Sequence, residues 1–147
     1  MRATGSTRRS GGLTNTKVFA RGVDDTPAET LQWREDAPTE GKVVFFRDGP
    51  KREVTIETPE GIRPVNHVWC VHSPDGFEWG YGGSGPAECA LNLLGFFVGP
   101  KDAWSLHQRF KSYFIAGVPR DGGHIDISTI REVTPAFYAE WLADQKR

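Results

Sequence analysis

The residue types that could do chemistry gather in one glycine-rich segment, Trp79-Gly-Tyr-Gly-Gly-Ser-Gly-Pro86. Four glycines within six residues let the backbone turn tightly, because glycine adopts positive φ at little steric cost. Backbone N–H groups in such a turn, together with the N-terminus of a following helix, can bind phosphate or carboxylate groups. Two interpretations stay open: an anion site at Gly82, Gly83, Ser84 and Gly85, or a tight joint that only positions a helix. The joint is the simpler of the two.

The same segment lacks the remaining parts of a catalytic or phosphate-binding motif. A P-loop requires Lys and then Ser or Thr after its last glycine, and Pro86 stands there instead. Ser84 could act as a nucleophile with His72 or His124 as its base, but the closing glycine of the G-x-S-x-G elbow is missing. We therefore expect a protein that is not an enzyme and that uses no cofactor.

Metal-binding chemistry finds little support in the sequence. His67 and His72 are five residues apart in the strand-like run 66–72, and residues an odd number apart point to opposite faces of a strand. Cys70 and Cys89 each stand among apolar residues, and the chain has no CxxC pair. This pattern predicts two buried thiols, with a disulfide as the lesser alternative. We expect no metal site.

Strand-like segments precede the glycine-rich turn. Alternating or β-branched apolar residues predict strands at 17–21, 42–47, 52–58, 66–72 and 77–79. Turn-forming residues between the second and third of these segments predict a hairpin. The buried face of such a sheet must pack against whatever follows the turn.

Helical patterns follow the turn. Apolar residues at helical spacing predict a helix over 87–94 that starts with Pro86. A second helix is expected over 101–116, with Tyr113 on its apolar face, and a third from Thr134-Pro135 to Ala143. A short strand at 124–127 lies between the second and third helices. This order predicts an α+β fold, a mostly antiparallel sheet of about four to five strands followed by two to three helices.

Charge is unevenly distributed along the 147 residues, although the net charge is only −1. Residues 1–23 carry five bases and no acid, whereas residues 24–60 carry a net charge of −5. The Ser-, Thr-, Gly- and Arg-rich composition of residues 1–16 predicts a flexible basic arm, followed by a single domain at 17–147. Hydrophobic residues make up 37% of the chain, enough for one core and too many for a disordered protein.

These two charged stretches predict where partners bind. The residues expected to contact a partner are Arg2, Arg8, Arg9, Glu35, Asp36 and Glu40. The leading hypothesis is a non-enzymatic binding or assembly protein whose arm contacts neighbouring subunits or another partner. One alternative is a small inhibitor that places the acidic stretch 24–60 in the basic groove of a host defence or nucleic-acid machine. Another is a phosphate- or nucleotide-binding domain at Gly82–Pro86.

Composition also restricts how the chain could bind two other classes of partner, nucleic acid and membrane. Nucleic acid is expected to bind only through the basic arm, because the remainder of the chain is acidic. No apolar run reaches the length of a membrane-spanning helix, so we expect no membrane contact.

The segment His72–Leu94, with S-P-D-G-F-E-W-G-Y-G-G-S-G-P-A at its centre, resembles the signature of a small family of proteins of unknown function from bacteria, plasmids and phages. The resemblance runs from Lys17 to Leu142 and includes Phe110-Lys111 and Trp141-Leu142. The basic arm and the acidic insert around 24–40 depart from the family pattern. The resemblance implies no activity for this chain. It implies a phage or mobile-element setting, and with it a location in the host cytoplasm or in the virion.

Overall fold

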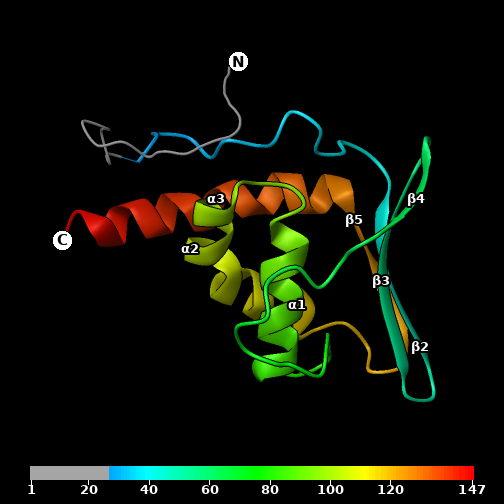
Figure 1. The fold of residues 1–147 in the computed structure, drawn as a ribbon. Helices are drawn as coiled ribbons and strands as arrows, with labels where there is room; N and C mark the ends of the chain where they lie inside the picture. The colour runs from blue at the N-terminus through cyan, green and yellow to red at the C-terminus, as the bar shows by residue number, and fades with distance from the viewer. Residues whose placement is uncertain (1–26) are drawn as a thin grey trace.

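A four-stranded antiparallel sheet lies on one side of the structure, and the helices pack against one of its faces (Figure 1). The computed structural model describes residues 27–147. The predicted strand at 17–21 and the predicted arm at 1–16 therefore lie outside the described residues. The strand order β4-β3-β2-β5, together with three α-helices, confirms the predicted α+β fold.

The described elements follow one another with short connections, apart from the loop before the first helix. In chain order they are β2 (Lys42–Asp48), β3 (Lys51–Thr58), β4 (Gly61–Pro64), α1 (Ser84–Leu94), α2 (Pro100–Phe110), the π-helical turn η1 (Lys111–Ile115), β5 (Gly122–Asp126) and α3 (Ile127–Gln145). Within this part of the chain, none of the helices is long and apolar enough to cross a membrane.

The predicted hairpin is formed by β2 and β3. Val43 pairs with Ile56 and Phe45 pairs with Val54 across the two strands, and all four side chains are buried. Alternate residues of a strand point to the same face. These four residues therefore make up the face of the sheet that the helices cover.

The fourth strand, β5, pairs antiparallel with β2 although the helices α1 and α2 separate the two strands in sequence. The predicted strand at 124–127 is thus confirmed, with its start two residues earlier. Gly122 opens β5 at a φ of +119°, and a Cβ at this position would lie 2.6 Å from the carbonyl oxygen of Phe45. The close approach of β5 to β2 therefore requires glycine at the first residue of β5.

Helix α1 lies at the centre of the fold and is buried along nearly its whole length (Figure 1). The predicted apolar stripe is buried as expected, and the opposite side of the helix is buried as well. As a result, the polar residues Glu88 and Asn92 lie inside the molecule. Trp79, just before the glycine-rich turn, is fully buried and packs edge-to-face on Phe45 with ring centroids 5.4 Å apart.

Two predicted strands are wrong, because residues 66–72 and 77–79 form irregular loop. The strand next to β3 is instead β4, which pairs with it at Gly61–Pro64. Backbone N–H groups of residues 66–72 still need partners. Glu88 and Asn92 of α1 accept four of them, from Val68, Trp69, Val71 and His72.

Two helix starts also differ from the prediction. Helix α1 begins at Ser84 after Gly83, so Pro86 is its third residue rather than its first. Helix α3 begins at Ile127 and continues through Pro135, where a new helix had been predicted. Proline has no N–H to donate inside a helix. Burial of the helical turn before Pro135 outweighs the loss of that hydrogen bond here.

The side chain of Tyr113 was predicted to face the core, but it is 59% exposed.

Replacing Gly122 with alanine will destabilise the sheet. A Cβ there strains a left-handed backbone and meets the Phe45 carbonyl group. Because strain of this kind costs about 1–3 kcal/mol before the steric contact is added, we expect the free energy of unfolding to fall by about 2–4 kcal/mol, measured by urea denaturation. Gly99→Ala is the control, since Gly99 has extended backbone and open space around it. Equal losses in the two variants would contradict this account.

Candidate functional site

The carboxylate of Glu88, which is fully buried on α1, is the centre of the candidate site. Its Oε1 accepts hydrogen bonds from the backbone N–H groups of Val71 at 3.0 Å and His72 at 2.8 Å. Its Oε2 lies 2.5 Å from Nε2 of His67. All three partners belong to residues 66–73, which we call the clamped loop. One buried side chain therefore fixes this loop to the helix.

Asn92 stands one helical turn after Glu88 and binds the same loop. Its Oδ1 accepts the N–H groups of Val68 and Trp69 at 2.7 and 2.8 Å. Its Nδ2 donates to the carbonyl groups of Trp69 and Glu88, both at 2.9 Å. A primary amide has two N–H donors and two acceptor positions. Asn92 therefore uses its full hydrogen-bonding capacity, with three bonds to the loop and one to its own helix.

The environment of Glu88 keeps this buried group charged. Burial by itself would raise its pKa, because a carboxylate loses hydration inside a protein. The amide of His72, the imidazole of His67 and the amide of Val71 oppose that effect, and together they hold the pKa of Glu88 below its ordinary value. Glu88 is therefore ionised at neutral pH and is a strong acceptor for the loop.

The clamped loop also brings a thiol to this carboxylate. Nε2 of His67, Sγ of Cys70 and a carboxylate oxygen of Glu88 all lie within 4.8 Å of one another. Both cysteines are free thiols, but only Cys89 is buried, so the prediction of two buried thiols is wrong for Cys70. The sequence argument against a metal site also loses its basis, because it treated residues 66–72 as a strand.

These three side chains do not resemble an activated nucleophile. Loss of hydration, followed by the charge of Glu88, raises the pKa of Cys70, whereas a catalytic cysteine needs a lowered pKa. Nε2 of His67 already faces Glu88 and is not available as a base for the thiol. What the cluster provides is one nitrogen, one sulfur and one oxygen donor around a small space.

A second polar cluster joins the clamped loop to α2. Nδ1 of His107 lies 2.7 Å from the Trp104 carbonyl oxygen, and its Nε2 lies 2.9 Å from Nε2 of His72. The ring of His72 stacks on Trp104 with an interplanar angle of 2°. Burial lowers the pKa of His107, and the neighbouring His72 and Lys111 add to this effect against the opposing Trp104 carbonyl. His107 is therefore neutral in its contact with His72.

The glycine-rich turn lies at the start of α1, as predicted, and most of its glycines are closely packed. A Cβ on Gly83 would lie 2.5 Å from the ring of Tyr81, and one on Gly85 would lie 2.7 Å from Cβ of Glu78. Gly82 has open space, and its carbonyl oxygen accepts a hydrogen bond from Lys111 at 3.2 Å. This packing supports the joint interpretation at 83 and 85, while the anion site at 82–85 stays a prediction.

Glu78 connects this turn to the sheet. Its carboxylate pairs with Nη2 of Arg47 on β2 at 2.8 Å and with Nε of Arg52 on β3 at 2.5 Å. All three side chains are less than a third exposed. The turn is therefore held between the sheet on one side and α1 on the other.

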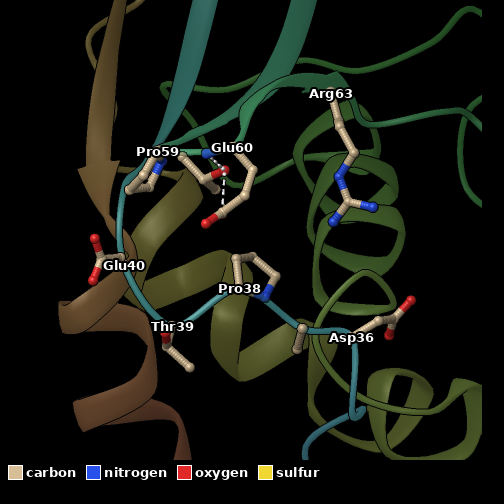
Figure 2. Close-up of a pocket in the computed structure, with 9 residues that line it drawn as sticks. Asp36, Pro38, Thr39, Glu40, Pro59, Glu60 and Arg63 are labelled. Carbon is tan, nitrogen blue, oxygen red and sulfur yellow. Dashed lines mark hydrogen bonds between the residues drawn. The ribbon is translucent and has the colours of Figure 1, made fainter.

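An acidic hollow with a volume of about 530 Å³ lies between residues 36–40 and the β3–β4 turn (Figure 2). Its charged lining residues are Asp36, Glu40, Glu60 and Arg63. Figure 2 shows Glu60 and Arg63 on the side of the hollow opposite Pro38. We call it the acidic hollow because three of these four side chains are carboxylates.

The predicted partner-binding residues are only partly brought together. Asp36 and Glu40 line the acidic hollow, and Glu35, although exposed, does not. Arg2, Arg8 and Arg9 lie outside the described residues. Glu60 and Arg63, which complete the hollow, were not singled out from the sequence, because only the β3–β4 turn places them opposite residues 36–40.

The centre of the candidate site was also missed. Neither Glu88 nor Asn92 was singled out from the sequence. The sequence did contain a sign of their role. Glu88 and Asn92 are four residues apart, and all other residues from 85 to 94 are small or apolar. That spacing places two hydrogen-bonding side chains on one face of a helix.

Asn92→Ala will release the clamped loop. The change removes the acceptor of the part-buried Trp69 amide and one of the two acceptors of the Val68 amide. We expect the free energy of unfolding to fall by about 1–3 kcal/mol. Hydrogen exchange at the amides of Val68 and Trp69 will speed up by more than the global change explains. Asn66→Ala, at an exposed site in the same loop, is the control and is expected to leave both readouts nearly unchanged.

Acidification below pH 6.5 will weaken the fold through His107. A histidine whose pKa is lower in the folded state gives stability that is present above its ordinary pKa of about 6.5 and is lost as the pH falls through the folded value. We therefore expect the free energy of unfolding to fall between pH 7.5 and 5.5 in urea titrations. His107→Asn should remove this loss, whereas His124→Asn, at an exposed position, should retain it. An unchanged pH slope in His107→Asn would refute the assignment.

Comparison with known proteins gives a family and no closer relative. Neither the curated proteins nor the solved structures contain a match to this chain. The model of a family of unknown function, DUF6166, matches residues 47–136. This range is more than half of the chain and includes the clamped loop, the glycine-rich turn and α1. The chain therefore belongs to the family of unknown function DUF6166.

Proposed function

We propose that the protein is a non-enzymatic assembly protein in which the basic arm of one copy binds the acidic hollow of a neighbouring copy. The observation that carries this proposal is the acidic hollow itself. It has the opposite charge to the arm, and it is built partly from Asp36 and Glu40 of the acidic stretch.

The hollow has carboxylates that can accept a cation. Asp36 pairs with Arg34 at 3.2 Å. Within residues 27–147, no basic group lies within 4.0 Å of the carboxylates of Glu40 or Glu60, and Glu60 has only Thr58 as a side-chain hydrogen-bonding partner. With Arg63 included, the charged lining of the hollow has a net charge of −2.

The arm has the complementary chemistry. Arg8 and Arg9 are adjacent, and each guanidinium presents a planar fork of N–H donors that fits a carboxylate. Seventeen residues lie between Arg9 and Pro27, the first described residue. A chain of that length spans at most about 60 Å when fully extended, which is enough to reach an adjacent copy.

The polar groups of the candidate site support a binding role rather than catalysis. Glu88 and Asn92 direct their hydrogen-bonding atoms to the backbone of the clamped loop. The loop then presents Val68 and Val71 to solvent, at 66% and 53% exposure. A rigid loop with exposed apolar side chains is typical of surfaces that contact other proteins.

The setting proposed for this assembly is a phage or another mobile element, with the protein in the host cytoplasm or in the virion. The family resemblance of His72–Leu94 supports this setting. The alternative in which the acidic stretch inhibits a host nucleic-acid machine uses the same carboxylates. The two proposals differ in partner: a basic groove of another protein in one, and the arm of this protein in the other.

Assembly should depend on both the arm and the hollow. We expect light scattering to give a mass above that of the monomer at about 0.05 M salt and the monomer mass at about 0.5 M, because salt screens exposed ion pairs. Removal of residues 1–16, or the double change Glu40→Lys and Glu60→Lys, should give a monomer at both salt concentrations. The double change Glu29→Lys and Glu140→Lys, at exposed sites outside the hollow, is the charge-matched control.

A mixing experiment separates binding between copies from binding within one chain. One variant lacks residues 1–16 and retains the hollow, and the other retains the arm but carries Glu40→Lys and Glu60→Lys. Each should be monomeric alone, and the mixture should form a one-to-one pair. A wild-type monomer at low salt, or a mixture that stays monomeric, would overturn the proposal.

A further inference from the structure

We propose that His67, Cys70 and Glu88 bind a divalent transition-metal ion, and that zinc is the ion they suit best. Their donor atoms lie within 4.8 Å of one another. Imidazole nitrogen, thiolate sulfur and carboxylate oxygen are the protein ligands that zinc takes, with bonds of about 2.0–2.3 Å. Ligands around one tetrahedral zinc ion are therefore roughly 3.5 Å apart. To hold the ion, Nε2 of His67 would move away from Oε2 of Glu88, which it now approaches to 2.5 Å, and Sγ of Cys70 would move towards both.

The buried carboxylate has little positive charge around it. Glu88 is fully buried. Among the described residues, His67 is the only basic side chain within 4.0 Å of its oxygens. A buried negative charge is costly unless a cation or hydrogen-bond donors compensate it. The loop amides and His67 supply hydrogen bonds to Glu88, and a metal ion between Glu88 and the loop would add a positive charge to them.

The hydrogen bonds of Glu88 assign its two oxygens to different tasks. Oε1 accepts the amides of Val71 and His72, so it orients the group. Oε2 faces His67 and has only a longer contact of 3.2 Å with the Val71 amide. Oε2 is therefore the oxygen available to the metal. Outer hydrogen bonds that fix one oxygen of a ligating carboxylate are typical of zinc sites.

The loop spacing places the other two ligands on the same side. His67 and Cys70 are separated by two residues, a spacing that lets both side chains reach one ion. The ring of His67 packs against Phe77 with ring centroids 5.1 Å apart, which limits its rotation. Because Glu88 comes from α1, the ion would link the clamped loop to the central helix.

Binding is a ligand exchange without a redox step. The hydrated ion releases all of its waters except one. The Cys70 thiol releases its proton to solvent as the S–Zn bond forms. The proton that Nε2 of His67 donates to Glu88 moves to Nδ1 or to solvent, so that Nε2 binds the ion through its lone pair. Three protein ligands leave a fourth position, which faces solvent beside the exposed Cys70 and would hold a water molecule. The proposal is independent of the assembly function, because none of these residues lines the acidic hollow.

Metal content of the full-length chain tests the proposal. The protein is incubated with a small excess of zinc, separated from unbound metal by gel filtration and analysed by inductively coupled plasma mass spectrometry. We expect about one zinc per chain for the wild type and less than about 0.2 for Cys70→Ser and His67→Asn. Cys89→Ala removes the other thiol and should retain about one zinc per chain.

Cobalt provides a spectroscopic readout of the sulfur ligand. A Co²⁺-loaded wild-type protein should show thiolate-to-cobalt charge-transfer absorption, and Cys70→Ser should lack it while its far-UV circular dichroism is unchanged. Saturating zinc should also raise the Tm of the wild type by roughly 5–10 °C and leave Cys70→Ser unchanged. Glu88→Gln is not the deciding variant, because the loop and the core depend on this residue.

Two results would overturn the proposal. One is a wild-type protein that retains less than about 0.2 zinc per chain and shows no charge-transfer band with cobalt. The other is full zinc binding by Cys70→Ser, since the metal would then lie elsewhere. Either result would leave His67 and Glu88 as a hydrogen-bonded pair.

Discussion

The buried charge of Glu88 is the constraint on which the arrangement of the site depends. A carboxylate inside a core is tolerated only when hydrogen bonds replace its lost hydration. Here those bonds come from the backbone of the clamped loop. Within residues 27–147, no strand lies beside this loop to satisfy its amides. The helix and the loop therefore stabilise each other, and neither is expected to keep its conformation without the other.

This dependence explains why α1 occupies the centre of the fold. One side of the helix is covered by the clamped loop through Glu88 and Asn92, and the remaining sides pack on the sheet and on the later helices. The glycine-rich turn controls where the helix begins. Glu78 attaches that turn to β2 and β3 through Arg47 and Arg52. The loop, the sheet and the later helices thus fix the position of α1. Helix α1 in turn fixes the carboxylate of Glu88 in the cluster of His67, Cys70 and Glu88.

The two proposed binding features differ in how they relate to the family. The cluster of His67, Cys70 and Glu88 lies wholly within the range matched by the family model. The acidic hollow lies only partly within it, since Asp36 and Glu40 precede residue 47. The metal site would therefore belong to the common domain, while arm-dependent assembly would be a property of the additional charged stretches of this chain.

The sequence by itself determined the α+β class, the β2–β3 hairpin, β5 and the three helical regions, because local periodicity and turn residues decide these elements. It also located the glycine-rich turn at the start of a helix. Only the tertiary structure decided that residues 66–72 form a loop, because the partners of their backbone are side chains 16 to 24 residues away. For the same reason it alone decided that Glu88 and Asn92 are buried and that Cys70 is exposed. Periodicity reports which side of a segment is apolar, whereas burial of the polar side depends on what else packs against it.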